Sequence, residues 1–266
     1  KLTEDAPVIV IEGDEYLSSA IEMKSKFLFY HPDITLISGV AWDHFNVFPT
    51  FESYVKAFEE LIDGMEKTGV LVYDKTDSIL KEVCEKDKVD LIRFPYEKHP
   101  YKVVNGKVFL QTSNGEVPLL IFGEHNMKNL QGAQIIMRQI GITDEMFYEA
   151  IKSFKGAAKR LETLGLNDNT LIFRDFAHAP SKVGATTNAA KELYDDRRLI
   201  ACYELHTYSS LNKDFLPQYF QKLNDADVAA VFFSPHTLEM KKMPELSIDD
   251  VKKYFGRDDL EVFTKQ

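Results

Sequence analysis

The stretch from Val8 to Glu15 constrains the fold of this chain more than any other. Four apolar residues, Val8-Ile9-Val10-Ile11, are followed at once by Glu12-Gly13-Asp14-Glu15. A strand that is buried on both faces of a parallel α/β sheet reads as a continuous apolar run, and such sheets bind ligands beyond the carboxyl ends of their strands. We therefore predict a buried strand over residues 8–11 that opens onto a binding site.

A second apolar segment, residues 34–41, ends in Asp43 and His44. Carboxylate and imidazole groups at two neighbouring strand ends predict a site for a hard cation that serves a phosphate ligand. The alternative interpretation is that these acids are solvated side chains at turns between a strand and a helix. The residues by themselves leave both interpretations open.

Strand-like and helix-like segments alternate along the chain, which predicts a layered α/β architecture. Helices are expected over residues 51–65, 77–84, 123–140, 181–194 and 215–223, and strands over residues 69–73, 171–173, 199–203 and 228–233. Between residues 91 and 122, short alternating segments with turns at Asn105-Gly106 and Asn114-Gly115 predict an antiparallel patch on an otherwise parallel sheet.

Gly141 suits the end of a helix, and Thr143 suits the beginning of the next one. We therefore place a domain boundary near Ile142. The prediction is a first domain over residues 1–142 and a second, doubly wound domain over residues 143–266.

Composition excludes several classes of function. The formal net charge of −10 argues against nucleic-acid binding and against an anionic membrane surface, and no apolar run reaches the length of a membrane span. Cys84 and Cys202 are the two cysteines, too few for a disulfide scaffold, so we expect a reduced, cytoplasmic protein.

A polar cluster opens the helix that is expected after residue 123. It contains His125, Asn126 and Asn129. An asparagine amide both donates and accepts hydrogen bonds, as recognition of an adenine edge requires, and a histidine ring can stack or hydrogen-bond. The alternative is that Asn126 only caps the helix.

Two further clusters lie in the second predicted domain. Arg160 could clamp a phosphate with its planar guanidinium group, or it could form a surface pair with Glu162. Asp175 and His178 follow an apolar strand just before a helix, again at a ligand-binding edge. The alternative for His178 is a capping or packed histidine. Residues 204–209 repeat the pattern one strand later.

The order and spacing of these clusters resemble the Mur ligases, the cytoplasmic ATP-dependent enzymes that form amide bonds in peptidoglycan synthesis. The resemblance covers nearly the whole chain and involves five motifs in order. They are Ile11-Glu12-Gly13-Asp14-Glu15, Asp43-His44, the segment from Gly123 to Asn129, Arg160-Leu161-Glu162, and Asp175-Phe176-Ala177-His178 with Pro180. The implied fold is α/β, with part of a central Mur-ligase ATPase domain followed by a Rossmann-like doubly wound C-terminal domain.

The resemblance also implies roles for single residues. Glu12 and His44 would bind Mg²⁺, while Asn126 and Asn129, with His125, would hold the adenine of ATP. Arg160 would face the phosphates. Asp175 and His178 would bring the second domain over the nucleotide, so that domain closure gates turnover.

The reaction that the resemblance implies begins with phosphorylation of the lactyl carboxylate of UDP-N-acetylmuramate by ATP. The amine of a second substrate then attacks the acyl phosphate, and phosphate leaves. Residues 14–16 and 24–27, with Leu161 and Phe176, resemble the muropeptide-recycling branch, whose amine substrate is the tripeptide L-alanyl-γ-D-glutamyl-meso-diaminopimelate. His206-Thr207-Tyr208-Ser209 is more similar to the branch that adds L-alanine.

Several positions depart from the family pattern. Gly13 and Ala41 stand where the family usually has Ala and an acid, and Ala179 replaces the second His of a His-His-Pro sequence. The 266 residues contain no Gly-x-x-Gly-Lys-Thr phosphate loop and no uridine-nucleotide-binding domain. We also expect the last strand of the C-terminal domain to be missing.

The missing phosphate loop implies that this piece is inactive by itself. Two other functions are compatible with the same residues. One is a magnesium-dependent phosphohydrolase that uses the acidic edge, and the other is a nucleotide-binding module without catalytic activity.

Overall fold

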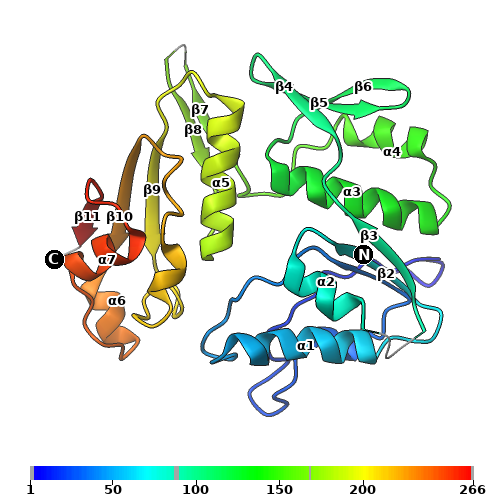
Figure 1. Ribbon diagram of the computed structural model, residues 1–266, viewed down its shortest axis with the longest axis horizontal. Coiled ribbons are helices and arrows are strands. Elements are labelled where there is room, and N and C mark those ends of the chain that lie inside the picture. Colours follow the sequence, from blue (N-terminus) through cyan, green and yellow to red (C-terminus); the bar gives the residue numbers. More distant parts are fainter. Residues whose placement is uncertain (1–2, 87–89, 168, 265–266) are drawn as a thin grey trace.

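The computed structural model describes residues 3–86, 90–167 and 169–264 of the chain. Figure 1 shows two parts, which we call the N-terminal part, up to helix α4, and the C-terminal part, from strand β7 onward. Both parts combine strands and helices, so the predicted α/β class is confirmed.

The N-terminal part is built on a parallel sheet with strand order β1-β2-β3. The strands are β1 (Ile34–Ile37), β2 (Val70–Asp74) and β3 (Ile92–Tyr96). Helices α1 (Phe51–Asp63) and α2 (Ser78–Cys84) connect these strands and share one hydrophobic core with β1 and β2. Helix α3 (Glu124–Gln139) packs on the opposite face, where Ile135 meets Val72 and Tyr96. A short 3-10 helix, η1 (Lys26–Phe29), precedes β1.

Local signals explain why the helices begin where they do. Thr50 forms a capping box with Ser53 at the start of α1, and the Asp77 carboxylate accepts hydrogen bonds from two backbone amides of α2. The predicted helices at 51–65, 77–84 and 123–140 are therefore confirmed, with slightly shorter bounds.

The predicted hairpins form a sheet of their own. Strands β4 (Tyr101–Val104), β5 (Lys107–Thr112) and β6 (Gly115–Leu119) pair antiparallel, with the first turn at Asn105-Gly106. The prediction that they extend the parallel sheet is wrong. The apolar face of β5 and β6 packs against α3 and α4 instead of extending the sheet beside β3.

Helix α4 (Asp144–Ile151) belongs with the N-terminal part by its contacts. Thr143 caps it as predicted, and Arg138 of α3 makes two hydrogen bonds of 2.7 Å to Asp144. Phe147 shares a core with the small antiparallel sheet. Helix α4 therefore packs with the N-terminal part, and the domain boundary near residue 142 stays a prediction.

The C-terminal part contains a second parallel sheet, with strand order β11-β10-β9. Strands β9 (Ile200–Leu205), β10 (Val228–Phe233) and β11 (Glu261–Thr264) are joined through the 3-10 helix η2 (Leu216–Tyr219) and helices α6 (Pro235–Met240) and α7 (Ile248–Phe255). Strand β11 contains Val262 and Phe263, the two apolar residues near the end of the chain.

Two predictions about the C-terminal part need correction. Strand β8 (Leu171–Arg174) pairs antiparallel with β7 (Glu162–Leu166) in a separate two-stranded ribbon, and its residues are not fully buried. The helix expected over residues 215–223 is reduced to the single turn of η2, which ends where the Phe220 backbone becomes extended and Gln221 adopts a φ of 61°. Helix α5 (Pro180–Leu193) is confirmed.

The predicted buried strand over residues 8–11 is also wrong. These residues form no strand, and their side chains are 47 to 83% exposed. A strand requires hydrogen bonds to a neighbouring strand, and no strand in the described ranges pairs with this segment. Apolar composition without a pairing partner therefore did not produce a strand.

The two parts share packed surfaces. Ala189 and Leu193 of α5 lie in the core that α3 and the small antiparallel sheet form, while Trp42 and Phe45 pack against Phe215 of the C-terminal part. These contacts hold the carboxyl end of β1 against the C-terminal part. No helix in the described ranges is long and apolar enough to cross a membrane.

Candidate functional site

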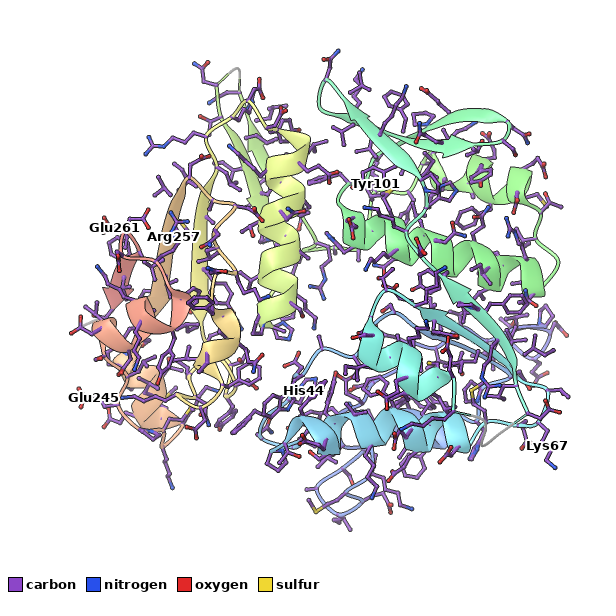
Figure 2. The ribbon with its side chains drawn as sticks, viewed as in Figure 1. His44, Lys67, Tyr101, Glu245, Arg257 and Glu261 are labelled. Atoms are coloured by element: carbon purple, nitrogen blue, oxygen red, sulfur yellow. The ribbon has the colours of Figure 1, made fainter. Side chains whose placement is uncertain are left out.

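The loop after β1 places Asp43 and His44 beyond the carboxyl end of the parallel sheet, as predicted. The Asp77 side chain accepts a hydrogen bond from the Val40 amide at 2.8 Å and so ties this loop to the start of α2. His44 has a φ of 53°, a left-handed conformation that a histidine rarely adopts. The Asp43 carboxylate accepts a 2.8 Å hydrogen bond from the His44 amide, which stabilises this turn. Figure 2 shows His44 on the side of the N-terminal part that faces the C-terminal part.

Asp43 is a buried carboxylate that faces a histidine and a lysine side chain from the C-terminal part. Its Oδ2 atom lies 3.5 Å from His178 Nε2 and 3.5 Å from Lys182 Nζ. Burial alone would raise the pKa of Asp43, but the hydrogen bond from His178 and the charges of His44 and Lys182 hold it well below its usual range. Asp43 therefore remains ionised and joins the two parts of the chain.

Glu15, and not Glu12, is the carboxylate that contacts His44. Glu15 Oε1 lies 3.4 Å from His44 Nε2 and accepts a hydrogen bond from the Tyr54 hydroxyl at 3.0 Å. The hydrogen bond to Glu15 raises the pKa of His44. The pKa of Glu15 is lowered: burial opposes the shift, and the hydrogen bonds from His44 and Tyr54 outweigh it. Glu12 is exposed and makes no hydrogen bond or ion pair within the described part of the chain.

The donor set around His44 is compatible with Mg²⁺. Mg²⁺ binds few protein ligands and keeps several waters, so one carboxylate and one imidazole can suffice. The described residues contain no group of three or more His, Cys, Asp and Glu side chains arranged for a metal ion. Glu15 and His44 form a pair, to which Glu12 could be added only if residues 8–13 moved toward the loop.

Asp175 organises the turn between β8 and α5. Its carboxylate accepts hydrogen bonds from the Leu161 amide at 2.8 Å and the Ala177 amide at 2.6 Å, and from the Thr186 hydroxyl at 3.3 Å. Leu161 has a φ of 46°, so the bond to Asp175 holds a strained residue next to Arg160. The carboxylate thus fixes the segment that carries the Arg160 side chain.

His125, Arg160 and Asp175 come together although they lie in three separate motifs. His125 is at the start of α3, and burial lowers its pKa, with the Asp175 carboxylate opposing this shift and the Arg160 guanidinium adding to it. The Nδ1 atom of His125 is buried and has no hydrogen-bond partner among residues 3–86, 90–167 and 169–264. Arg160 is exposed and lies 5.8 Å above the Phe176 ring, so its charge is available to an anion.

The two asparagines of the α3 motif behave differently. Asn126 is not the N-cap of α3, because Gly123 occupies that position with a φ of 88°. The Asn126 side chain donates a 2.8 Å hydrogen bond to the Phe122 carbonyl. Asn129 is exposed and makes no hydrogen bond among the described residues. The capping alternative for Asn126 is therefore wrong.

The alternative for Arg160, a surface pair with Glu162, is also wrong. Glu162 instead pairs with Arg174 at 2.9 Å.

A cavity of about 310 Å³ lies between the two parts beside Asp43 and His44. Its lining residues come from both parts of the chain, and they are Tyr16, Asp43, His44, Asn46, His178, His206, Thr207, Tyr208, Ser209 and Lys241. Of the strand-end segment at residues 204–209, His206, Thr207, Tyr208 and Ser209 line the cavity.

Sequence reasoning missed the Lys182 contact and chose Glu12 over Glu15. Lys182 lies on α5, 139 residues after the Asp43 side chain that it faces, and no local pattern indicates that pairing. Glu15 belongs to the same acidic stretch as Glu12. Its neighbour Tyr16 contacts the His44 ring edge-on at 5.0 Å, and this aromatic residue is the sequence feature that could have indicated Glu15.

Comparisons with known proteins show the family to which this chain belongs. Residues 2–137 match the family described as the Mur ligase middle domain. A UDP-N-acetylmuramate–L-alanine ligase from Desulfitobacterium hafniense is 26% identical over 90% of this chain and 56% of its own length. A protein of the same name from Lactobacillus delbrueckii subsp. bulgaricus is 29% identical over 88% of the chain and 53% of its own length. The chain thus spans about half the length of the curated relatives it matches.

Solved structures share the fold. A UDP-N-acetylmuramate–alanine ligase from Thermotoga maritima superposes with a TM-score of 0.61 at 18% identity, covering 90% of this chain and 52% of that one. A murein peptide ligase from Psychrobacter arcticus gives a TM-score of 0.60 at 20% identity, covering 95% and 54%. Because the middle-domain match extends over half of the sequence, the chain belongs to the Mur ligase family, with a Mur ligase middle domain at residues 2–137.

Proposed function

We propose that the complete protein is an ATP-dependent ligase of peptidoglycan synthesis that joins an amine to the lactyl carboxylate of UDP-N-acetylmuramate through an acyl phosphate. The observation that carries the proposal is the meeting of Asp43 with His178 and Lys182, 3.5 Å from each, next to His44. Two domains that supply charged groups to one cavity suit a reaction whose barrier is lowered mainly by positioning and charge neutralisation.

The roles of single residues are part of this proposal. Mg²⁺, when bound, would neutralise phosphate charge, with His44 and a carboxylate from the 12–15 stretch as its protein ligands. Glu12 is the ligand that the family resemblance implies, and Glu15 is the carboxylate that lies beside His44.

The nucleotide would lie along the His125 side of the same edge. Asn126 and Asn129 would contact the adenine, and the unpaired Nδ1 atom of His125 offers a further polar contact. Arg160 would face the phosphates, since its guanidinium has no ion pair among the described residues. Asp175 and His178 would hold the C-terminal part over the nucleotide.

The two domains would be the C-terminal part of an ATP-binding domain and a ligase domain. No phosphate loop of the Gly-x-x-Gly-Lys-Thr type occurs in these 266 residues. We therefore expect the chain alone to turn over ATP far more slowly than the complete protein, because the β- and γ-phosphates lack their main binding loop.

The identity of the amine is the open choice within the proposal. The names of the curated relatives favour L-alanine, whereas the residues at 14–16 and 24–27 favour the tripeptide L-alanyl-γ-D-glutamyl-meso-diaminopimelate. The experiment is to incubate the product of the complete gene with ATP, Mg²⁺, UDP-N-acetylmuramate and either amine, and to detect the amide product by mass spectrometry. We expect a product with one of the two amines, and no product with either would contradict the proposal.

A further inference from the structure

The backbone carbonyl of His178 receives hydrogen bonds from two tyrosine side chains. The Tyr219 hydroxyl donates to it at 2.6 Å and the Tyr203 hydroxyl at 2.7 Å. The two hydroxyl oxygens lie 2.9 Å apart. Tyr203 comes from β9 and Tyr219 from η2, so two separate elements of the C-terminal part converge on one carbonyl group.

The His178 carbonyl is free to accept these bonds because it lies just outside the helix. Ala179 is the N-cap of α5 and Pro180 follows at the first helical position. The helix begins with the bond from the Val183 amide to the Ala179 carbonyl, one residue after His178. A carbonyl oxygen has two lone pairs, so both hydroxyls can donate to it at the same time.

Both hydroxyls remain donors across the range of pH in which proteins are folded. Burial raises the pKa of Tyr203 and of Tyr219. Tyr219 is fully buried, its ring stacked on Phe255 at 5.2 Å and edge-on to Phe215 at 6.3 Å. The Tyr219 hydroxyl therefore has little freedom to move away from the carbonyl.

The same backbone segment carries the ring that faces the N-terminal part. His178 Nδ1 donates to the Phe176 carbonyl at 3.0 Å, so Nε2 is the ring atom left to face Asp43 Oδ2 at 3.5 Å. With the backbone held by the two hydroxyls and Nδ1 held by Phe176, the direction of Nε2 is determined.

We propose that Tyr203 and Tyr219 form a clamp that positions His178 against Asp43 and so sets the geometry of the cavity between the two parts. Tyr203 and Tyr219 are positioning residues, since neither is among the residues that line the cavity. The part of this inference that concerns turnover rests on the proposed ligase function, and the part that concerns geometry does not.

The first test uses the 266-residue chain and needs no activity. The variants are Tyr203→Phe, Tyr219→Phe and the double variant, each of which keeps the ring and removes only a hydroxyl. Tyr73→Phe is the matched control, because it also removes a buried hydroxyl that donates a hydrogen bond, to Glu85 at 3.1 Å, but within the N-terminal part.

The readout is the NMR signals of the His178 ring and of the His44 amide, which donates to Asp43. We expect these signals to shift in the double variant, to shift less in each single variant, which keeps one donor, and to stay in place in Tyr73→Phe. Signals in the double variant that overlay those of the unmodified chain would overturn the clamp. Thermal unfolding of the single variants checks that they are folded.

The second test uses the complete protein in the ligase assay. We expect kcat of the double variant to fall about tenfold while KM for ATP changes by less than about twofold, because misplaced groups slow the reaction more than they weaken binding. An unchanged kcat would overturn the positioning role. An inactive unmodified protein would instead contradict the proposed function, and the NMR test would still decide the clamp.

Discussion

Asp43 Oδ2 and His178 Nε2 lie 3.5 Å apart, although one belongs to the loop after β1 and the other to the turn before α5. This contact, with that of Lys182 to the same carboxylate, joins the two parts of the chain at the mouth of the cavity. Asp43 is only 7% exposed, so its charge depends on His178 and Lys182 together with the neighbouring His44.

Removing the Asp43 charge should destabilise the chain. In Asp43→Asn, His178 and Lys182 lose their common carboxylate partner, and we expect the free energy of unfolding to fall by about 1–3 kcal/mol. Urea unfolding measures it. The control is Glu149→Gln, which removes an exposed pair with Lys152 and should change stability by less than about 0.5 kcal/mol. Equal losses of unfolding free energy in the two variants would show that the Asp43 contact stabilises the chain no more than an exposed ion pair does.

Gly123 should not tolerate a side chain. Its φ is 88°, and a Cβ atom there would lie 2.4 Å from Ala189 Cβ on α5, where the two parts pack together. We expect Gly123→Ala to lower the free energy of unfolding by about 2–4 kcal/mol, through both backbone strain and the clash. Thermal or urea unfolding measures the loss.

Gly115→Ala separates strain from the clash. Gly115 also has a positive φ, 108°, but a Cβ atom there meets nothing within 4 Å. It should therefore show the strain component alone, a loss of about 1 kcal/mol. A loss in Gly123→Ala no larger than in Gly115→Ala would contradict the close packing of α3 on α5.

His125 should make stability depend on pH in a defined direction. Burial lowers its pKa below the ordinary value of 6.5, so the unfolded chain binds a proton more readily than the folded one. Its contribution to stability is therefore complete above pH 6.5 and is lost as the pH falls below that value. Unfolding free energies measured between pH 8 and pH 5 should fall less steeply in His125→Gln than in the unmodified chain.

The exposed His236 provides the control for that measurement. Its side chain is 74% exposed, so His236→Gln makes the same substitution at a surface position for comparison. A His125→Gln variant that keeps the full slope would show that the buried ring does not titrate as the structure indicates.

Glu15 should control the protonation of His44. The hydrogen bond to Glu15 raises the pKa of His44, so Glu15→Gln should lower it, while Glu12→Gln should not. NMR titration of the His44 ring gives both values. A raised histidine pKa stabilises the folded chain at low pH. The stability lost in Glu15→Gln should therefore be largest below the pKa of an unfolded histidine. The loss should shrink as the pH rises through the folded-state pKa of His44. An effect of Glu12→Gln equal to that of Glu15→Gln would mean that residues 8–13 lie against the loop in solution.

Most helices were predictable because their signals are local. Thr50 with Ser53, Asp77, and Asn105-Gly106 each act within three or four residues; the first two cap predicted helices and the third forms the predicted turn. The run from Val8 to Ile11 is the counterexample, since a strand depends on a partner elsewhere. The helix expected over residues 215–223 is another, since the chain leaves the helical conformation at Gln221, which has a φ of 61°.

The candidate site was predictable in its residue types but not in its contacts. His125, Arg160 and Asp175 were found one motif at a time, and only the fold brings them together. Lys182 has no local signature, because its role comes from the face of α5 that meets Asp43. The choice of Glu15 at His44 depends on the loop in which Asp14 binds Lys26 at 2.6 Å, a packing feature that composition does not reveal.

The central claim is that this cavity serves the joining of an amine to an acyl phosphate. The most direct measurement is phosphate release by the complete protein with ATP, Mg²⁺ and UDP-N-acetylmuramate, in the presence and absence of the amine substrate. We expect release that depends on the amine and equals the amount of amide formed. Release at the same rate without the amine would contradict it and would identify a phosphohydrolase, and nucleotide binding without any release would identify a module that only binds.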